Sequence, residues 1–364
     1  MKALLIMVVL LLVGCAETPP PPESGFAGLG STQDGFRAVN PTEPLVFPRD
    51  HAAHPEYRIE WWYVTANLTT AEGQPLGIQW TLFRQALAPE AGANAWQDNQ
   101  LWMAHVGLTT AEAHWHGERF GRTGQAGVEL EPSYRVWLDD WALAATLPTA
   151  TVLAQQQDLL SDIEIQAQTN DFAYNLSLST TKPLVQQGEQ GFSVKSDRGQ
   201  ASWYFSQPFY EVSGTASWPG TEPQPVTGTA WLDREWSSQP LASEQLGWDW
   251  FSMQFDDGAR LMTFRLREAD RDDGFKAGTW ITPQGEAYPL NTDDIQMIPL
   301  GWAAAGPTEV PVRWRIEVPR LGVAITTEAL NPSAWMPTTI AYWEGPIRVR
   351  GSHMGVGYLE MTGY

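Results

Sequence analysis

Residues 60–84 read EWWYVTANLTTAEGQPLGIQWTLFR, and residues 247–267 read GWDWFSMQFDDGARLMTFRLR. In each stretch a tryptophan-rich alternating run is followed by a short turn that contains glycine and by a second alternating run. This pattern predicts an antiparallel hairpin. Because it occurs twice, about half the chain length apart, we predict two related β domains. Paired antiparallel barrels lined by tryptophan enclose apolar cavities, and there we expect the function to lie.

The composition limits the classes of protein to which the chain can belong. The chain has 364 residues, which is long enough for two domains that each bury a core. It carries 42 acidic and 22 basic residues, a net charge of −20, so anionic lipid surfaces are poor partners and we expect no nucleic-acid binding. The 19 tryptophans suit cavity walls as well as packed cores, because each indole combines a large apolar surface with one N–H donor.

The N-terminus predicts a lipoprotein signal peptide over residues 1–14. The stretch MKALLIMVVLLLVG has one cation and then an apolar run too short to span a bilayer, which is typical of a secretory signal. Cys15 follows directly, and the sequence LVGC resembles the bacterial lipobox, in which this cysteine is acylated. Cys15 is the only cysteine, so intramolecular disulfides and thiolate metal sites are excluded. We expect the acylated Cys15 to hold the protein at a membrane surface.

Turn-rich and alternating segments divide the rest of the chain. Residues 15–44 are rich in Pro, Gly and Ser, which predicts a flexible linker behind the acylated cysteine. From residue 45 onward, short alternating runs are separated by turn signals, and this pattern predicts an all-β chain. The best helical candidate covers residues 150–163. We place one domain over residues 45–235 and a second over residues 236–364.

The segment TAWLDREWS, residues 229–237, holds the strongest candidate for chemistry. On a strand, Trp231, Asp233 and Glu235 share one face. Burial beside a like charge raises the pKa of at least one carboxyl, which leaves an acid able to protonate an alkene or a leaving group near neutral pH. The other interpretation is that both carboxylates lie on the surface or pair with Arg234. The sequence lacks the motifs of nucleotide-binding proteins, serine hydrolases and zinc peptidases, and we expect no cofactor.

Carboxylates also stand beside the tryptophans of the two expected hairpins. Glu60 and Trp62 in the first run, and Asp249 and Trp250 in the second, are predicted to line a barrel mouth and bind substrate. Each carboxylate has the alternative role of anchoring a neighbouring indole N–H. His105 lies on the less apolar face of its expected strand, where it is either a catalytic base or donor or a structural histidine.

Two histidine pairs have a spacing found in metal sites. His51 and His54 lie in an expected loop, whereas His114 and His116 would point the same way on a strand. No third or fourth ligand stands nearby in the sequence, so we expect no metal.

Seven segments carry a pattern shared with known proteins: residues 54–58, 60–65, 229–237, 247–251, 342–345, 351–353 and 357–364. Together they resemble the AttH-like and carotenoid 1,2-hydratase (CrtC-like) lipocalin superfamily. The resemblance extends over roughly residues 45–364. It implies two tandem lipocalin-like (calycin) antiparallel β-barrel domains, in agreement with the repeated hairpin.

The resemblance also implies an activity. In the hydratases an acid protonates a terminal double bond, a tertiary carbocation forms, and water captures it. Asp233 is the position that matches the acid, Trp231 matches a neighbouring aromatic residue, and Glu235 or His105 assists. In the upstream strand, where the hydratases have a histidine, this chain has none, and Tyr204 is expected to orient the substrate instead.

Two functions remain open at the level of the sequence. The first is a cell-envelope hydrolase or hydratase that acts on a hydrophobic, isoprenoid- or lipid-like substrate. The second is a non-catalytic lipid carrier, or a periplasmic accessory of an ABC transport system of the lipoprotein-export type, which holds an apolar ligand in the same barrel. Ala16 and Glu17 follow the cysteine, and by resemblance to Gram-negative lipoproteins they favour the periplasmic face of the outer membrane.

Overall fold

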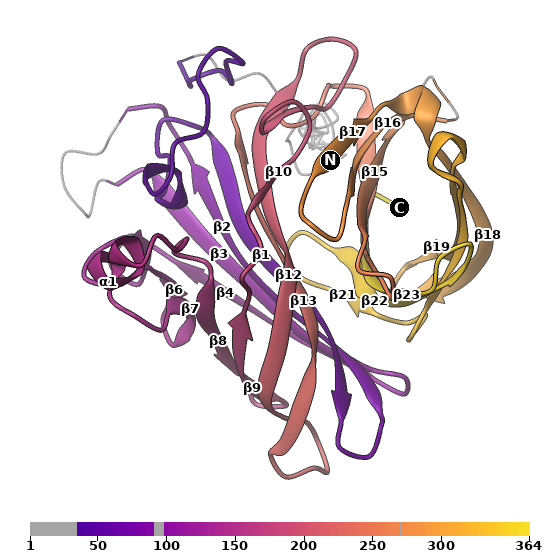
Figure 1. The fold of residues 1–364 in the computed structure, drawn as a ribbon, viewed down its shortest axis with the longest axis horizontal. Coiled ribbons are helices and arrows are strands. Elements are labelled where there is room, and N and C mark those ends of the chain that lie inside the picture. The colour runs from indigo at the N-terminus through magenta and orange to yellow at the C-terminus, as the bar shows by residue number, and fades with distance from the viewer. Residues whose placement is uncertain (1–34, 91–97, 270, 272) are drawn as a thin grey trace, which may run out of the picture.

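The computed structural model describes residues 35–90, 98–269, 271 and 273–364. The signal peptide, Cys15 and most of the predicted linker lie outside these residues. The described chain consists mainly of antiparallel strands, which form one 13-stranded and one 10-stranded sheet (Figure 1). No helix within the described residues is long and apolar enough to cross a membrane.

The strands follow the chain in two groups, one for each sheet. The first sheet contains β1 (Ile59–Thr70), β2 (Pro75–Ala86), β3 (Gln100–Thr110), β4 (His114–Gly121), β5 (Ala126–Glu129), β6 (Arg135–Leu138), β7 (Trp141–Ala145), β8 (Asp162–Gln168), β9 (Ala173–Ser179), β10 (Val185–Gln186), β11 (Phe192–Val194), β12 (Ala201–Ser217) and β13 (Gln224–Ser237). The second contains β14 (Gln245–Phe255), β15 (Arg260–Glu268), β16 (Phe275–Ile281), β17 (Ala287–Leu290), β18 (Gln296–Ala305), β19 (Thr308–Val318), β20 (Val323–Ala329), β21 (Trp335–Met336), β22 (Tyr342–Gly351) and β23 (Gly355–Thr362).

Each sheet curls around an apolar core of its own. The first has the order β4-β3-β2-β1-β13-β12-β9-β8-β7-β6-β5, and the second has the order β17-β16-β15-β14-β23-β22-β20-β19-β18. In Figure 1 the first sheet lies to the left and the second curls round on the right, with β12 and β13 beside the second domain. The predicted fold class, two tandem lipocalin-like barrels, is therefore confirmed.

Three apolar clusters hold the molecule together. One fills the first barrel and includes Trp62 and Trp80, and a second fills the second barrel and includes Trp314. The third lies between the domains and includes Tyr63 and Trp250. Because side chains alternate across a strand, the same strands supply a barrel core on one face and the domain interface on the other.

The two tryptophan-rich stretches form the first hairpin of each sheet, β1–β2 and β14–β15, as the sequence predicts. If the two stretches are aligned on their first tryptophans, Trp61 and Trp248, the pairing in the structure shifts that alignment by two residues. Glu60 lies opposite Arg84 in the first hairpin, and Asp249 lies opposite Arg265 in the second, each pair joined by a buried salt bridge. The structural equivalent of Trp61 is therefore the residue after Asp249, namely Trp250, and not Trp248.

The junction between the sheets is short. The first sheet ends at Ser237 and the second begins at Gln245, so residues 238–244 connect the domains. The predicted helix over residues 150–163 is wrong in length, because α1 covers only Thr149–Ala154. The rest of that segment leads into β8, in which apolar and polar residues alternate and which pairs with β9.

Candidate active site

A cavity of about 290 Å³ lies between the two domains. Strands β1 to β4, β12 and β13 contribute to its lining from the first sheet, and β14, β15, β22 and β23 contribute from the second. The predicted position of the cavity inside a barrel is wrong. Tryptophans at core-facing positions, such as Trp62 and Trp80, fill the first barrel, whereas the opposite faces of the same strands bound the hollow.

The register of the first sheet explains why these side chains meet. Residues directly opposite one another on neighbouring strands point to the same side of a sheet. One such row crosses the sheet from β12 to β4 and is largely polar: Ser206, Asp233, Tyr63, Thr81, His105 and Glu118. The next row is largely aromatic and apolar: Tyr204, Glu235, Trp61, Phe83, Met103 and Phe120. The first domain therefore presents a row of polar side chains next to a row of apolar ones.

Asp233 is 2% exposed and accepts three side-chain hydrogen bonds. Tyr204 donates to Oδ2 at 2.7 Å, while Ser206 and Trp231 donate to Oδ1 at 2.5 and 2.6 Å. These bonds favour the carboxylate, but burial outweighs them and, together with the charge of Glu235, raises the pKa of Asp233 to about 7. Asp233 is thus partly protonated at neutral pH, as a general acid must be.

Glu235 faces the same cavity as one half of an ion pair. Lys195 Nζ lies 2.7 Å from Glu235 Oε1, and Ser202 donates a hydrogen bond to the same oxygen. The Lys195 ammonium also lies over the rings of Phe264 and Tyr204, at 4.3 and 4.9 Å from their centroids. Glu235 is thus held at the cavity wall by a cation and a hydroxyl that bind the same carboxylate oxygen.

A second carboxyl with a raised pKa reaches the cavity from the other domain. Glu360 Oε1 accepts a hydrogen bond from Trp248 Nε1 at 2.6 Å. Burial, together with the charges of Asp233 and Glu235, raises the pKa of Glu360 to about 7. Because each negative charge disfavours the next, the cavity holds both protonated and ionised carboxyls at neutral pH. An acid–base pair requires that combination.

His105 lies next to Glu118, the last residue of the polar row, and is fully buried. Its Nε2 is 3.0 Å from Glu118 Oε1, and its Nδ1 is 2.9 Å from the hydroxyl of Tyr342, which belongs to the second domain. His105 therefore lines the cavity and also bridges the domain interface. Trp250 makes a similar bridge, since its Nε1 donates to Tyr204 Oη at 3.1 Å.

The structure brings together Asp233, Glu235, His105, Tyr204 and Trp250 around the cavity, with Trp231 behind Asp233. Glu60, Trp62 and Asp249 do not line it, so their predicted placement at a substrate site is corrected. Glu60 and Asp249 form buried salt bridges with arginines, and Trp62 belongs to the first core. The physical reason is the two-residue period of a strand, which points these three side chains away from the cavity.

The histidine pairs occupy other surroundings. His51 and His54 contact separate carboxylates, while His114 and His116 stack with their ring centroids 6.2 Å apart. Across residues 35–90, 98–269, 271 and 273–364, no group of three or more His, Cys, Asp or Glu side chains is arranged to hold a metal ion.

Sequence reasoning missed Tyr63, Lys195 and Glu360. A signal exists for Tyr63, because Trp61 and Tyr63 share one face of β1. An assignment of Trp61, and not Trp62, to the cavity side would have included Tyr63. Lys195 lies in a loop that carries no periodicity, and Glu360 comes from the last strand. Only the packing of one domain on the other brings Glu360 to the cavity that Asp233 faces, whereas Lys195 reaches Glu235 from a loop of the same domain.

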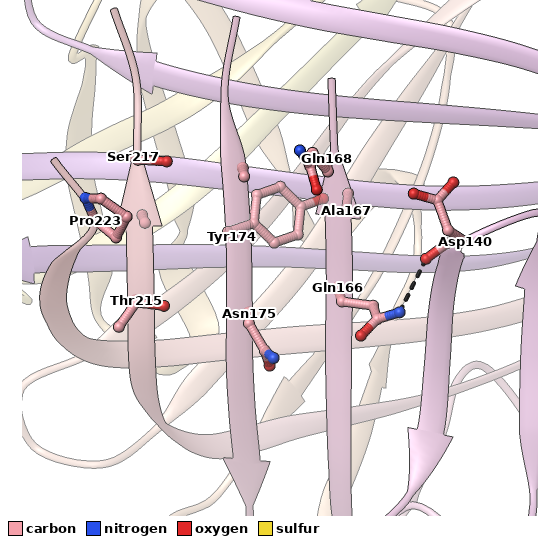
Figure 2. Close-up of a pocket in the computed structure, with 11 residues that line it drawn as sticks. Asp140, Gln166, Ala167, Gln168, Tyr174, Asn175, Thr215, Ser217 and Pro223 are labelled. Atoms are coloured by element: carbon pink, nitrogen blue, oxygen red, sulfur yellow. Dashed lines mark hydrogen bonds between the residues drawn. The ribbon is translucent and has the colours of Figure 1, made fainter. Parts of the chain in front are cut away.

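A second hollow, of about 270 Å³, lies over β8, β9 and β12 (Figure 2). Its lining is mainly polar, and Gln166 donates a hydrogen bond to the backbone carbonyl of Asp140 at 3.0 Å. Asp140 is its only carboxylate among the lining residues, and it is exposed and paired with Arg119. The hollow thus lacks the buried, proton-exchanging carboxyls of the interdomain cavity, and we assign the candidate site to the latter.

The two raised pKa values predict a characteristic dependence of stability on pH. Between about pH 4 and pH 7 the folded chain keeps protons on Asp233 and Glu360 that the unfolded chain has released, so the free energy of unfolding falls as pH rises. For Asp233 the loss approaches about 4 kcal/mol. Urea unfolding at about pH 5 and pH 8 should show a smaller loss for D233N than for the wild type. Equal losses for the two proteins would contradict the raised pKa of Asp233.

Two curled antiparallel sheets with a carboxyl-bearing cavity between them define a two-domain lipocalin-like protein. The AttH-like family profile matches residues 38–364, and the chain belongs to this family. It is similar to the structure of an AttH protein from Nitrosomonas europaea, with 33% identity, a TM-score of 0.77, and coverage of 90% of this chain and 99% of that chain. No curated protein sequence matches the chain.

Two more distant structures share the fold. Kievitone hydratase from Nectria haematococca is 13% identical, with a TM-score of 0.65 and coverage of 90% of this chain and 95% of that chain. CghA bound to Sch210972 is 9% identical, with a TM-score of 0.52 and coverage of 84% and 88%. Both matches cover more than four fifths of this chain, so proteins of much lower sequence identity share its fold.

Proposed function

We propose that this protein is a hydratase that adds water to a carbon–carbon double bond of an apolar, isoprenoid-like substrate in the interdomain cavity. The observation that carries the proposal is Asp233, a buried carboxyl with a pKa of about 7 in a cavity walled by aromatic rings. The fold shared with kievitone hydratase supports the same reaction class.

The proposed reaction needs one acid and one base. Protonated Asp233 gives its proton to one alkene carbon, which leaves a carbocation on the other and a carboxylate on Asp233. The ring faces of Trp250 and Phe264 stabilise the cation. Ionised Glu360 accepts a proton from the water that attacks the cation, and the product is an alcohol. Return of that proton from Glu360 to Asp233 closes the cycle.

The size of the cavity restricts the substrate. Its volume of about 290 Å³ lies near the lower end of the range of about 300–1,000 Å³ found for ligand pockets. We therefore propose that it holds a short isoprenoid or one end of a longer chain. A direct test incubates the protein with farnesol in ¹⁸O-labelled water and searches for a product heavier by one labelled water, with lipids co-purified from the native host assayed in parallel.

Turnover should follow a bell-shaped pH profile centred near pH 7. The reaction needs protonated Asp233 and ionised Glu360, so kcat/KM should fall on both sides of neutrality by about tenfold per pH unit at the limits. In E360Q the decline toward acid pH should vanish, because no base remains to be protonated. A rate that stays constant between about pH 5 and pH 9 would refute the acid–base pair.

The second candidate is a non-catalytic carrier. The observation in its favour is the largely apolar lining of the interdomain cavity, which suits an apolar ligand with or without chemistry. Tight binding of farnesol without any product would support the carrier, and co-purification with an ABC permease would support an accessory role. For either function we propose that Cys15, outside the described residues, anchors the protein at the periplasmic face of the outer membrane.

A further inference from the structure

A chain of polar groups leads from beside the cavity to the protein surface through both domains. It begins at Glu344 on β22, which is 2% exposed and stands directly opposite Glu360 on β23. The hydroxyl of Tyr63, from the first domain, donates a hydrogen bond to Glu344 Oε1. The chain ends at Glu118 on β4, whose side chain is 21% exposed.

Tyr342 and His105 connect these two ends. Tyr342 lies two residues before Glu344 on the same face of β22, and its hydroxyl interacts with the Glu344 carboxyl. The same hydroxyl is 2.9 Å from His105 Nδ1, and His105 Nε2 is 3.0 Å from Glu118 Oε1. Glu118 is fixed in turn by Thr339, whose N–H and hydroxyl donate to its two oxygens at 2.9 and 3.0 Å.

The surroundings of Glu344 favour its protonated form. Burial, with the charge of Glu360 next, raises the pKa of Glu344 well above its usual range. The other titratable groups that act on it are hydroxyls, those of Tyr63 and Tyr342 through hydrogen bonds and those of Tyr174 and Tyr358 through charge, and none of the described cations acts on it. Oε2 is buried and makes no hydrogen bond with the described residues. A proton on Oε2 would satisfy this atom through the Tyr342 hydroxyl.

We propose that Glu344, Tyr342 and His105 form a proton relay between the carboxyls of the cavity and Glu118 at the surface. The proton on Glu344 Oε2 passes to the Tyr342 oxygen while the Tyr342 hydroxyl proton passes to His105 Nδ1. The proton on His105 Nε2 then passes to Glu118. One O–H or N–H bond breaks and one forms at each transfer. The net result is a carboxylate at Glu344, His105 as the Nδ1–H tautomer and an acid at Glu118, which exchanges its proton with water.

The relay matters when the cavity is occupied. An apolar ligand that fills the cavity displaces water, which removes the direct route by which Asp233 and Glu360 exchange protons with solvent. Tyr63 joins Glu360 to the relay, because its hydroxyl donates to Glu344 Oε1 and also interacts with the Glu360 carboxyl. The carboxylate left at Glu344 takes the Tyr63 hydroxyl proton while the Tyr63 oxygen takes the proton of Glu360, which provides a second route through the wall. This role rests on the proposed function, in which the relay restores the protonation states of Asp233 and Glu360 after each turnover. The residues of the relay are positioning residues, because they act through Glu360.

Infrared spectroscopy of hydrogen–deuterium exchange tests the relay without turnover. The carbonyl stretch of a protonated carboxyl shifts when its proton is replaced by deuterium, and E344Q identifies the band of Glu344. With the cavity filled by N-phenyl-1-naphthylamine, Y342F should slow exchange at this band by about tenfold or more relative to the wild type. In the empty protein the two rates should agree, because water in the cavity supplies the proton. Tyr288, an exposed residue on β17, provides the matched control Y288F.

Two results would overturn the relay. The first is an E344Q spectrum that keeps every protonated-carboxyl band of the wild type. That result would mean that Glu344 is ionised and has no proton to pass on. The second is equally fast exchange in the wild type and Y342F when the probe fills the cavity. Neither result depends on a substrate, so the relay can fail while hydration of farnesol is observed. A slow-exchanging Y342F in a protein without turnover would instead leave the relay standing and remove the hydratase.

Discussion

D233N should lose about 10²- to 10⁴-fold in turnover while it still binds an apolar probe in the cavity. The amide cannot release a proton to an alkene, yet it matches the carboxyl in size. Its oxygen can still accept the hydrogen bonds that Ser206 and Trp231 now donate to Oδ1. The measurements are kcat for hydration and the dissociation constant of N-phenyl-1-naphthylamine.

The matched control for this experiment is E211Q. Glu211 lies on β12, the strand next to Asp233, but its side chain is exposed and outside the cavity. It should keep both wild-type turnover and wild-type binding. Wild-type turnover in D233N would eliminate Asp233 as the acid. Loss of binding together with turnover would instead indicate that Asp233 shapes the cavity rather than acting on the substrate.

E60Q should cost about 3–5 kcal/mol of the free energy of unfolding. Glu60 is fully buried between Arg84 and Arg234, both fully buried themselves, at 2.5 and 3.2 Å. Although burial acts in the opposite direction, Arg84 and the hydrogen bond with His54 hold the pKa of Glu60 well below its usual value. Removal of this carboxylate leaves two guanidinium groups inside the protein without a counter-charge.

Urea denaturation near pH 7 measures this loss, and E317Q is the control. Glu317 pairs with Arg315 at 3.3 Å on the surface, and their side chains are 29% and 48% exposed. Such a pair contributes at most about 1 kcal/mol. If E60Q and E317Q were destabilised equally, the buried network would not be the structural anchor of the first hairpin. If E60Q kept the stability of the wild type but lost turnover, Glu60 would have a role in the active site.

The sequence predicts the architecture well because the signals for it are local. A two-residue alternation and a glycine turn specify a hairpin wherever they occur, and their repetition specifies two domains. The same alternation placed Asp233, Glu235 and Trp231 on one face of β13, as the structure shows. It also placed His105 on the less apolar face of β3, which is the face that borders the cavity.

The same alternation could not say which face of each strand meets the barrel core. Both faces of β1 carry tryptophan and both are buried, one in the first core and one between the domains. Glu60 was therefore placed at the cavity although it belongs to the opposite side. A buried charge with a partner far along the chain looks the same in the sequence as a buried charge that meets a substrate.

The amino-acid sequence alone specifies tandem antiparallel barrels and a candidate acid, Asp233, on the same strand face as Trp231. The location of the site and the groups that complete it follow from the tertiary structure. Glu360 and Tyr342 come from the end of the chain, and Lys195 comes from a loop, so none has a local signal that links it to Asp233. Contacts between strands that are distant in the sequence are set by how two finished sheets pack, and that packing turns the outer faces of two barrels into one cavity.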